Sequence, residues 1–374
     1  MRLDREVARI AARPQKVRRP HVYPLVMNGD MRIAQRGTSA TGVGASNSYV
    51  TVDRFRHNFA NTAGRLTSTQ STDVPDGQGF KHSLKLDCTT ADTSIAANEF
   101  GQIYQSFEGQ DLGLINKGTA DCSTFTVAFW AKGTAKTYAC ELYDSDNNRQ
   151  ITKLFTVSTS WTKHIINFPA DTSTDDNFTY DNDQSFMINF GIHMGSDVTS
   201  GTLNTDSWAD ATSANRYAGI DSFFSSTDNE LYLTGVQLEL GTFNESTIPE
   251  FQFVDQATQL MQCQRYAQVF VNGNAQSMGY GVCYQADAVF VDLHFKNVMR
   301  ATPTAEVTTS TNYWAINSGG TTDTFDSWSG VSSQTHQNGG MLFCDGNNLS
   351  VTKGHTGDVY SNNAAAKIVI SADL

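Results

Sequence analysis

Residues 125–130 have the sequence FTVAFW, in which large apolar side chains recur at every second position. A period of two is that of a half-buried β-strand, because successive side chains point to opposite faces of a sheet. Residues 138–143 show the same alternation. Further runs rich in Val, Ile, Leu, Phe and Tyr predict strands at residues 154–157, 164–168, 186–192, 231–238, 289–295 and 366–370. We therefore expect an all-β protein.

The composition favours the same fold class. Of the 374 residues, 39% are hydrophobic, 17% are charged and 29 are Gly, a mixture that favours short strands and tight turns over long helices. Strands separated by long polar loops predict a jelly-roll or β-sandwich domain over residues 27–250. We expect a second β-rich domain over residues 251–374, which opens with a short helix that ends near Tyr266.

The first 26 residues differ from the rest in charge. Residues 1–25 hold seven basic groups against two acidic ones, a net charge of +5 in a chain whose total is −12. Apolar residues at helical spacing, ended by Pro14, predict a short helical arm that docks onto an acidic protein surface. A solvated tail and a DNA-binding segment are the alternatives. The expected docking residues are Leu3, Arg5, Val7, Arg9, Ile10, Arg13, Arg18 and Arg19.

The remaining chain carries a net charge of −17, which argues against a nucleic-acid-binding surface there. Its six cysteines are far apart and form no metal-binding pair, so we expect reduced, buried thiols in a protein assembled in a cytoplasm. The sequence has no run of about 18 apolar residues, so it predicts no membrane span. It also does not begin with the apolar core of a signal peptide.

Acidic loops are the obvious places to look for a bound metal. The sequence DSDNN at residues 144–148 resembles the start of a calcium loop, but Arg149 and Phe155 stand where an EF-hand needs Gly and Glu. We therefore expect a hairpin turn there. A denser acidic loop could hold a cation, although a solvated surface is the favoured interpretation; its residues are Asp171, Asp175, Asp176, Asp181 and Asp183. We expect no resident metal or cofactor, with a structural calcium ion as the one alternative.

Catalytic patterns do not occur in the sequence. The eight histidines are scattered without a zinc-binding spacing, and neither a nucleophile elbow nor a phosphate-binding loop is found. With 29 Asp and nine Glu, a catalytic carboxylate pair could not be chosen from the sequence. We expect no catalytic residues and no enzyme activity.

Sugar binding requires exposed aromatic faces beside polar side chains, because a pyranose ring presents an apolar face and hydroxyl groups. Trp130 and Trp161 lie in strand patterns and are expected in the core. Other aromatic and acidic residues lie in polar loops and are the candidate carbohydrate-binding residues: Trp208, Trp314, Trp328, Tyr313, Asp206 and Asp326. Equally, these aromatic side chains could pack the loops down or line a subunit interface.

Several segments resemble phage tail-fibre and related virion proteins, a family common among phages of marine bacteria. The most specific are LTGVQLE at residues 233–239 and CQRY at residues 263–266, in order with NGDMRIAQRGTS at residues 28–39 and SADL at residues 371–374. The resemblance covers about residues 27–374. It implies a virion component with a carbohydrate-binding-module-like jelly roll and a β-rich tip or assembly domain, most often a homotrimer. The chain departs from the family in its short basic arm, which replaces a long tail-attachment domain or shaft.

The function expected from the resemblance is host attachment. A tail fibre or adsorption appendage would bind host surface polysaccharide and contact tail or connector subunits through its arm. Two alternatives remain: a head- or tail-surface decoration or adaptor protein without host contact, and a glycan depolymerase. In each case the expected location is the phage particle, after assembly in the host cytoplasm.

Overall fold

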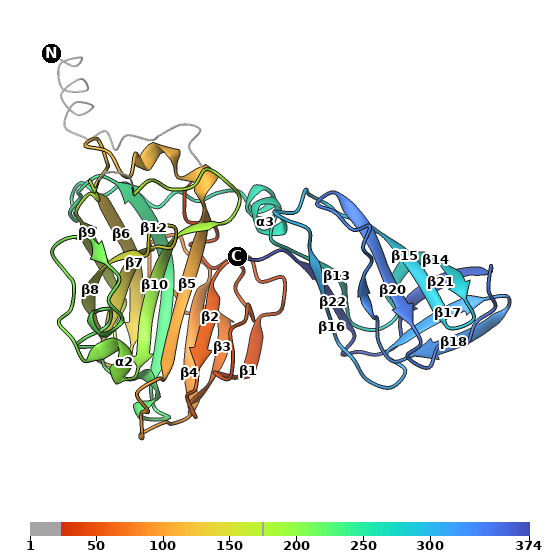
Figure 1. The fold of residues 1–374 in the computed structure, drawn as a ribbon. Helices are drawn as coiled ribbons and strands as arrows, with labels where there is room; N and C mark the ends of the chain where they lie inside the picture. Colours follow the sequence, from red (N-terminus) through yellow and green to blue (C-terminus); the bar gives the residue numbers. More distant parts are fainter. Residues whose placement is uncertain (1–23, 174–175) are drawn as a thin grey trace, which may run out of the picture.

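The computed structural model describes residues 24–173 and 176–374, and its regular secondary structure is mainly antiparallel sheet (Figure 1). The all-β expectation, with a jelly-roll or β-sandwich domain, is confirmed. The basic arm of residues 1–23, with all eight expected docking residues, lies outside the described residues. None of the helices in the described ranges is long and apolar enough to cross a membrane.

Two six-stranded sheets form the first sandwich. One sheet has the order β1 (Ser39–Val43), β3 (Arg65–Ser71), β4 (Ser83–Thr90), β12 (Glu230–Leu240), β6 (Phe125–Gly133) and β9 (Thr162–Phe168). The other has the order β11 (Ala209–Asp210), β8 (Arg149–Val157), β7 (Lys136–Asp144), β10 (Gln184–Met194), β5 (Phe100–Glu108) and β2 (Arg56–Ala60). The connections between strands of this sandwich contain the short helices η1 (Gly109–Asp111), η2 (Gly113–Ile115), α2 (Ser196–Thr199), η3 (Ser213–Asn215) and η4 (Phe223–Ser225).

The core of this sandwich consists of the inward-facing residues that the alternation predicts. Phe125, Val127 and Phe129 of β6 are fully buried, and Phe129 packs edge-on against Phe155 of β8 and Phe190 of β10. The DSDNN segment is a hairpin turn between β7 and β8, as expected, and the pairing of Asp144 with Arg149 closes it.

A second body follows helix α3 (Gln256–Gln264), which begins where the Asp255 carboxylate accepts a hydrogen bond from the Thr258 amide. It has a three-stranded sheet of β13 (Ala267–Asn272), β22 (Lys367–Ser371) and β16 (Thr304–Val307). A seven-stranded sheet has the order β18 (Thr321–Phe325), β17 (Trp314–Ser318), β21 (Thr356–Ser361), β14 (Ser277–Gln285), β15 (Ala288–His294), β20 (Gly339–Asp345) and β19 (Gly330–Val331). The second body has its own hydrophobic core.

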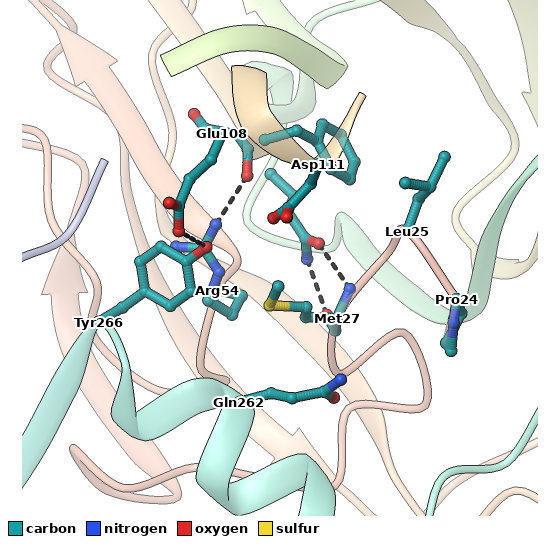
Figure 2. Close-up of a pocket in the computed structure, with 11 residues that line it drawn as sticks. Pro24, Leu25, Met27, Arg54, Glu108, Asp111, Gln262 and Tyr266 are labelled. Atoms are coloured by element: carbon teal, nitrogen blue, oxygen red, sulfur yellow. Dashed lines mark hydrogen bonds between the residues drawn. The ribbon is translucent and has the colours of Figure 1, made fainter. Parts of the chain in front are cut away.

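Buried charges join the two bodies. Glu108, at the end of β5, accepts hydrogen bonds of 2.7 and 2.6 Å from Arg265. It accepts another from the Tyr266 hydroxyl group (Figure 2). The Arg54 guanidinium lies 3.4 Å from the centre of the Tyr266 ring. Burial raises the pKa of Glu108, but the hydrogen bonds from Arg265 and Tyr266 outweigh it and hold this pKa below its usual value. The carboxylate is therefore charged and paired at neutral pH.

Three of the segments that carry the family resemblance, residues 28–39, 263–266 and 371–374, meet at this junction. Arg36, from residues 28–39, forms ion pairs with Glu306 and Asp373 of the second body. The main-chain oxygen of Leu374 accepts hydrogen bonds of 3.0 Å from both Tyr49 and Arg56 of the first sandwich. These segments therefore have a structural role that the sequence did not reveal.

Buried His57 makes stability depend on pH. Its imidazole, in β2, lies 2.9 Å from the Ser68 hydroxyl group, and burial lowers its pKa to about 4. The unfolded chain, with a pKa near 6.5, takes up this proton first as the pH falls. The contribution of neutral His57 to the free energy of unfolding is therefore fully present above pH ~6.5. It falls by about 3 kcal/mol as the pH drops from ~6.5 to about 4.

We predict that His57→Gln, whose amide can still reach Ser68, removes this part of the pH dependence. Urea unfolding at pH 7 and pH 4 would measure the loss of unfolding free energy for each protein. That loss should be about 3 kcal/mol smaller in the variant than in the wild type. Equal losses in both proteins would show that His57 is not the responsible group.

Candidate functional site

The structure places the three candidate tryptophans in hydrophobic cores. Trp208 is 7% exposed, and its indole donates a 2.8 Å hydrogen bond to the Pro169 carbonyl oxygen. Trp314 and Trp328 are 0% and 5% exposed and pack against each other in the second body. The expectation that these indole rings are exposed is therefore wrong. Trp208 and Trp328 anchor polar loops, the alternative considered from the sequence, whereas Trp314 is the first residue of strand β17.

The six candidate residues do not form one site, because Trp208 belongs to the core of the first sandwich and Trp314 and Trp328 to that of the second body. Asp206 is exposed near Trp208, whereas Tyr313 and Asp326 belong to the second body. The Asp326 carboxylate accepts a hydrogen bond from the Asn312 amide and so holds a turn in place. Whether these loops contact a glycan stays a prediction.

Trp130 and Trp161, which were expected in the core, are only half-buried and line a surface depression of about 610 Å³. Beside it lies a second depression of about 350 Å³, which shares Trp130, Lys163 and Glu245 with the first. We call the two together the tryptophan groove. Its other lining residues include Asn167, Phe243, Asn244, Phe80, Gln237, Phe251 and Phe253.

Strand β6 determines the orientation of Trp130. Phe129 points into the core, so its neighbour Trp130 has the opposite parity and faces outward, where it pairs with Lys163 of β9. The adjacent strand β12 has an irregular register between Thr234 and Gln237, and Gly235 there has a φ of 64°. A Cβ atom at Gly235 would lie 2.6 Å from the Phe80 ring and 3.1 Å from the Trp130 ring. This glycine of the LTGVQLE segment thus lets both rings approach the backbone.

Trp161 is held by polar contacts at its edge. Its indole N–H donates a 2.9 Å hydrogen bond to Asp73, which also pairs with Lys132. The Lys132 ammonium lies 6.0 Å from the centre of the Trp161 ring and 4.8 Å from that of Tyr232. The ring therefore has a fixed orientation before any ligand binds.

The groove also contains a positioned amide. Asn167 of β9 donates a 2.9 Å hydrogen bond to the Phe243 carbonyl oxygen and accepts one from the Thr126 hydroxyl group. These bonds fix the loop that carries Phe243, Asn244 and Glu245 against β9. Fixed aromatic faces beside amide, ammonium and carboxylate groups suit a ligand with an apolar face and many hydroxyl groups.

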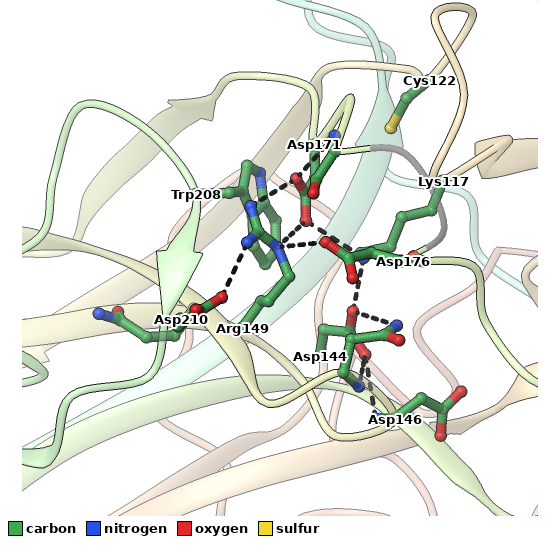
Figure 3. Close-up of polar contacts among 12 residues, drawn as sticks. Lys117, Cys122, Asp144, Asp146, Arg149, Asp171, Asp176, Trp208 and Asp210 are labelled. Carbon is green, nitrogen blue, oxygen red and sulfur yellow. Dashed lines mark hydrogen bonds and ion pairs between the residues drawn. The ribbon is translucent and has the colours of Figure 1, made fainter.

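Two cations of the chain itself balance part of the acidic loop (Figure 3). The Lys117 ammonium, 1% exposed, lies 2.6 Å from Asp144 and 3.1 Å from Asp171, and donates to the main-chain oxygen of Asp176. Arg149 forms two hydrogen bonds to Asp171. Burial disfavours ionisation of Asp171, but Arg149 and Lys117 together hold its pKa below its usual value. Lys117 thus takes the central position that a cation would need among these oxygen atoms.

A separate buried group contains metal-ligating residue types. Asp92, Glu99 and His193 lie with one ligand atom each within 4.8 Å of one another. His193 is 2.8 Å from Glu99 and 2.7 Å from the Ser222 hydroxyl group, while Asp92 accepts hydrogen bonds from Thr62 and Ala63. Hydrogen bonds of the protein itself therefore account for all three side chains.

A third cavity, of about 260 Å³, lies at the junction of the two bodies (Figure 2). Leu25 and Met27 lie on one side of it, and Arg54, Asp111 and Tyr266 line the other. Burial and the nearby charge of Glu108 raise the pKa of Asp111. The cavity belongs to the junction and brings together none of the residues expected to bind sugar.

Comparisons with known proteins give structural neighbours but no family. No family pattern and no curated protein matches the sequence. Among solved structures, the chain is similar to the enzymatically active domain of tailspike protein 4 of bacteriophage CBA120 (14% identity, TM-score 0.31), over 58% of this chain and 21% of that one. It is also similar to a CBM4 structure (11% identity, TM-score 0.28), over 57% of this chain and 97% of that one. A family 30 carbohydrate-binding module is similar too (14% identity, TM-score 0.28), over 60% of this chain and 92% of that one. Likeness this weak carries no inference about ligand or role.

We predict that Lys117→Met strongly destabilises the first sandwich. The change leaves the buried carboxylates of Asp144 and Asp171 without their shared cation, at a cost of about 3–5 kcal/mol in unfolding free energy. Lys132→Met is the matched control, because its partner Asp73 is 41% exposed, and it should cost less than about 1 kcal/mol. Chemical unfolding of both variants measures the difference. Similar values would contradict a structural role for the Lys117 network.

Proposed function

We propose that this chain is a non-enzymatic, glycan-binding component of a phage particle that contributes to adsorption on the host. The tryptophan groove carries the proposal: Trp130 and Trp161 are half-buried and oriented by the protein, with polar side chains beside them. Half-exposed indole rings stack on the apolar face of a sugar, and the amide and charged groups bind its hydroxyls. The assignment to a phage particle rests on the family resemblance of residues 27–374.

We favour recognition over turnover for this groove. Lys163 and Glu245 are charged residues common to its two depressions, whereas glycosidases place two carboxyl groups on either side of the scissile bond. Glu250 lies in the second depression, but it has an interaction partner within the protein. Binding without cleavage is therefore the proposed activity.

The direct test is binding of the purified full chain to surface polysaccharides isolated from a panel of bacterial strains. We expect saturable binding to at least one polysaccharide, with a change in tryptophan fluorescence because Trp130 and Trp161 lie at the site. Trp161→Ala should raise the dissociation constant about tenfold, since it removes one stacking platform. A reducing-sugar assay on the same mixtures should show no release.

Tyr180→Ala is the matched control, because Tyr180 is an 80% exposed aromatic residue that does not line the groove. It should bind as the wild type does, and thermal melting should show that both variants are folded. Unchanged affinity in Trp161→Ala would place the ligand elsewhere. Release of reducing sugar would make the protein an enzyme and refute the binding-only part of the proposal.

A further inference from the structure

The outer face of the seven-stranded sheet exposes large apolar side chains. On β14, Tyr280 is 79% exposed, Val282 51% and Tyr284 61%. On the two strands beyond it, Phe290, Met341 and Phe343 are half-buried. We call these six residues the β14–β15–β20 face.

Strand register makes this face one continuous surface. Val282 pairs with Phe290, which in turn pairs with Phe343, so an apolar row crosses all three strands. The rings of Phe290 and Phe343 stack at 5.7 Å, and Tyr284 meets Phe290 edge-on at 5.6 Å. A shallow depression of about 600 Å³ lies over the face.

The opposite side of the same strands is also apolar. Cys283, Val289, Val291, Leu342 and Cys344 are fully buried or nearly so in the core of the second body. A sheet with one solvated face normally alternates apolar and polar residues, whereas strands covered on both faces are apolar throughout. The sequence of these three strands therefore fits a sheet whose second face is covered.

We propose that a second copy of this chain covers the β14–β15–β20 face. Tyr280, Val282 and Tyr284 alone expose roughly 400 Å². That area is about half of the ~800 Å² that each partner contributes to a standard interface, so the half-buried rings and a polar rim would complete one. This inference does not depend on the glycan-binding proposal, because the face lies in the second body and shares no residue with the tryptophan groove.

A copy of the same face is the occupant that matches its chemistry. Among the residues that line the depression, Asp292 is the one charged side chain, so two acidic chains meet there without a cluster of like charges. The lining is mainly hydrocarbon, with Asp292 and Gln334 as its polar side chains besides the tyrosine hydroxyls. Two apolar sheet faces pack well against each other across a symmetry axis.

The test is the molar mass of the full chain in solution, measured by light scattering and sedimentation over a range of concentrations. We expect a homo-oligomer in the wild type. Tyr280→Glu places a charge in the proposed contact and should weaken the association roughly tenfold or more. Tyr180→Glu is the matched control, since Tyr180 and Tyr280 are 80% and 79% exposed, and it should leave the mass unchanged.

Three results would overturn the proposal. The first is a wild-type chain that stays monomeric at high micromolar concentration. The second is a Tyr280→Glu variant that melts as the wild type does and keeps its mass. The third is polysaccharide binding that Tyr280→Glu abolishes without any change in mass, which would make the face a ligand site. Loss of binding in Trp161→Ala with an intact oligomer tests the groove alone, so the two proposals can fail separately.

Discussion

The carboxylate of Glu108 is the group on which the arrangement of the two bodies depends. It is 0% exposed, at the end of strand β5 of the first sandwich, and its hydrogen-bond partners Arg265 and Tyr266 directly follow α3. A buried charge left without partners would cost several kcal/mol, so the end of α3 has little freedom to move away. Strand β13 begins at the next residue, Ala267, and the second body starts from this fixed point.

Much of the fold could be predicted from local sequence because one physical rule, alternation on a half-buried strand, acts between neighbouring residues. Strands such as β6 and β10 carry long apolar alternations and were predicted within a few residues. The short strands β17 and β18, with sequences WAINS and TTDTF, have no comparable alternation. They form because backbone hydrogen bonds pair them with each other and β17 with β21, a non-local cause that local patterns do not contain.

The candidate site was predicted less well, for two distinct reasons. Trp130 could have been placed outside the core, because its parity is opposite to that of Phe125, Val127 and Phe129. The burial of Trp208 and Trp328 had no local signal, since polar neighbours do not reveal that a loop folds back over a core, and Trp314 belongs to strand β17, which no sequence pattern predicted. Likewise, the cation that balances Asp144 and Asp171 comes from Lys117, 27 residues before Asp144. Contacts of this kind depend on the whole fold.

The two proposed surfaces differ in chemistry in a way that suits separate tasks. The tryptophan groove mixes half-buried rings with polar groups, and such sites hold single ligands with modest affinity because water competes for every hydrogen bond. The β14–β15–β20 face is mainly apolar, and association there gains free energy from burial alone. Copies joined through the second body would present several tryptophan grooves on one oligomer. Linked sites of this kind can exceed the affinity of a single site by about 10²–10⁴ when their spacing matches the ligand. Weak recognition in one body would thus become firm attachment through self-association of the other.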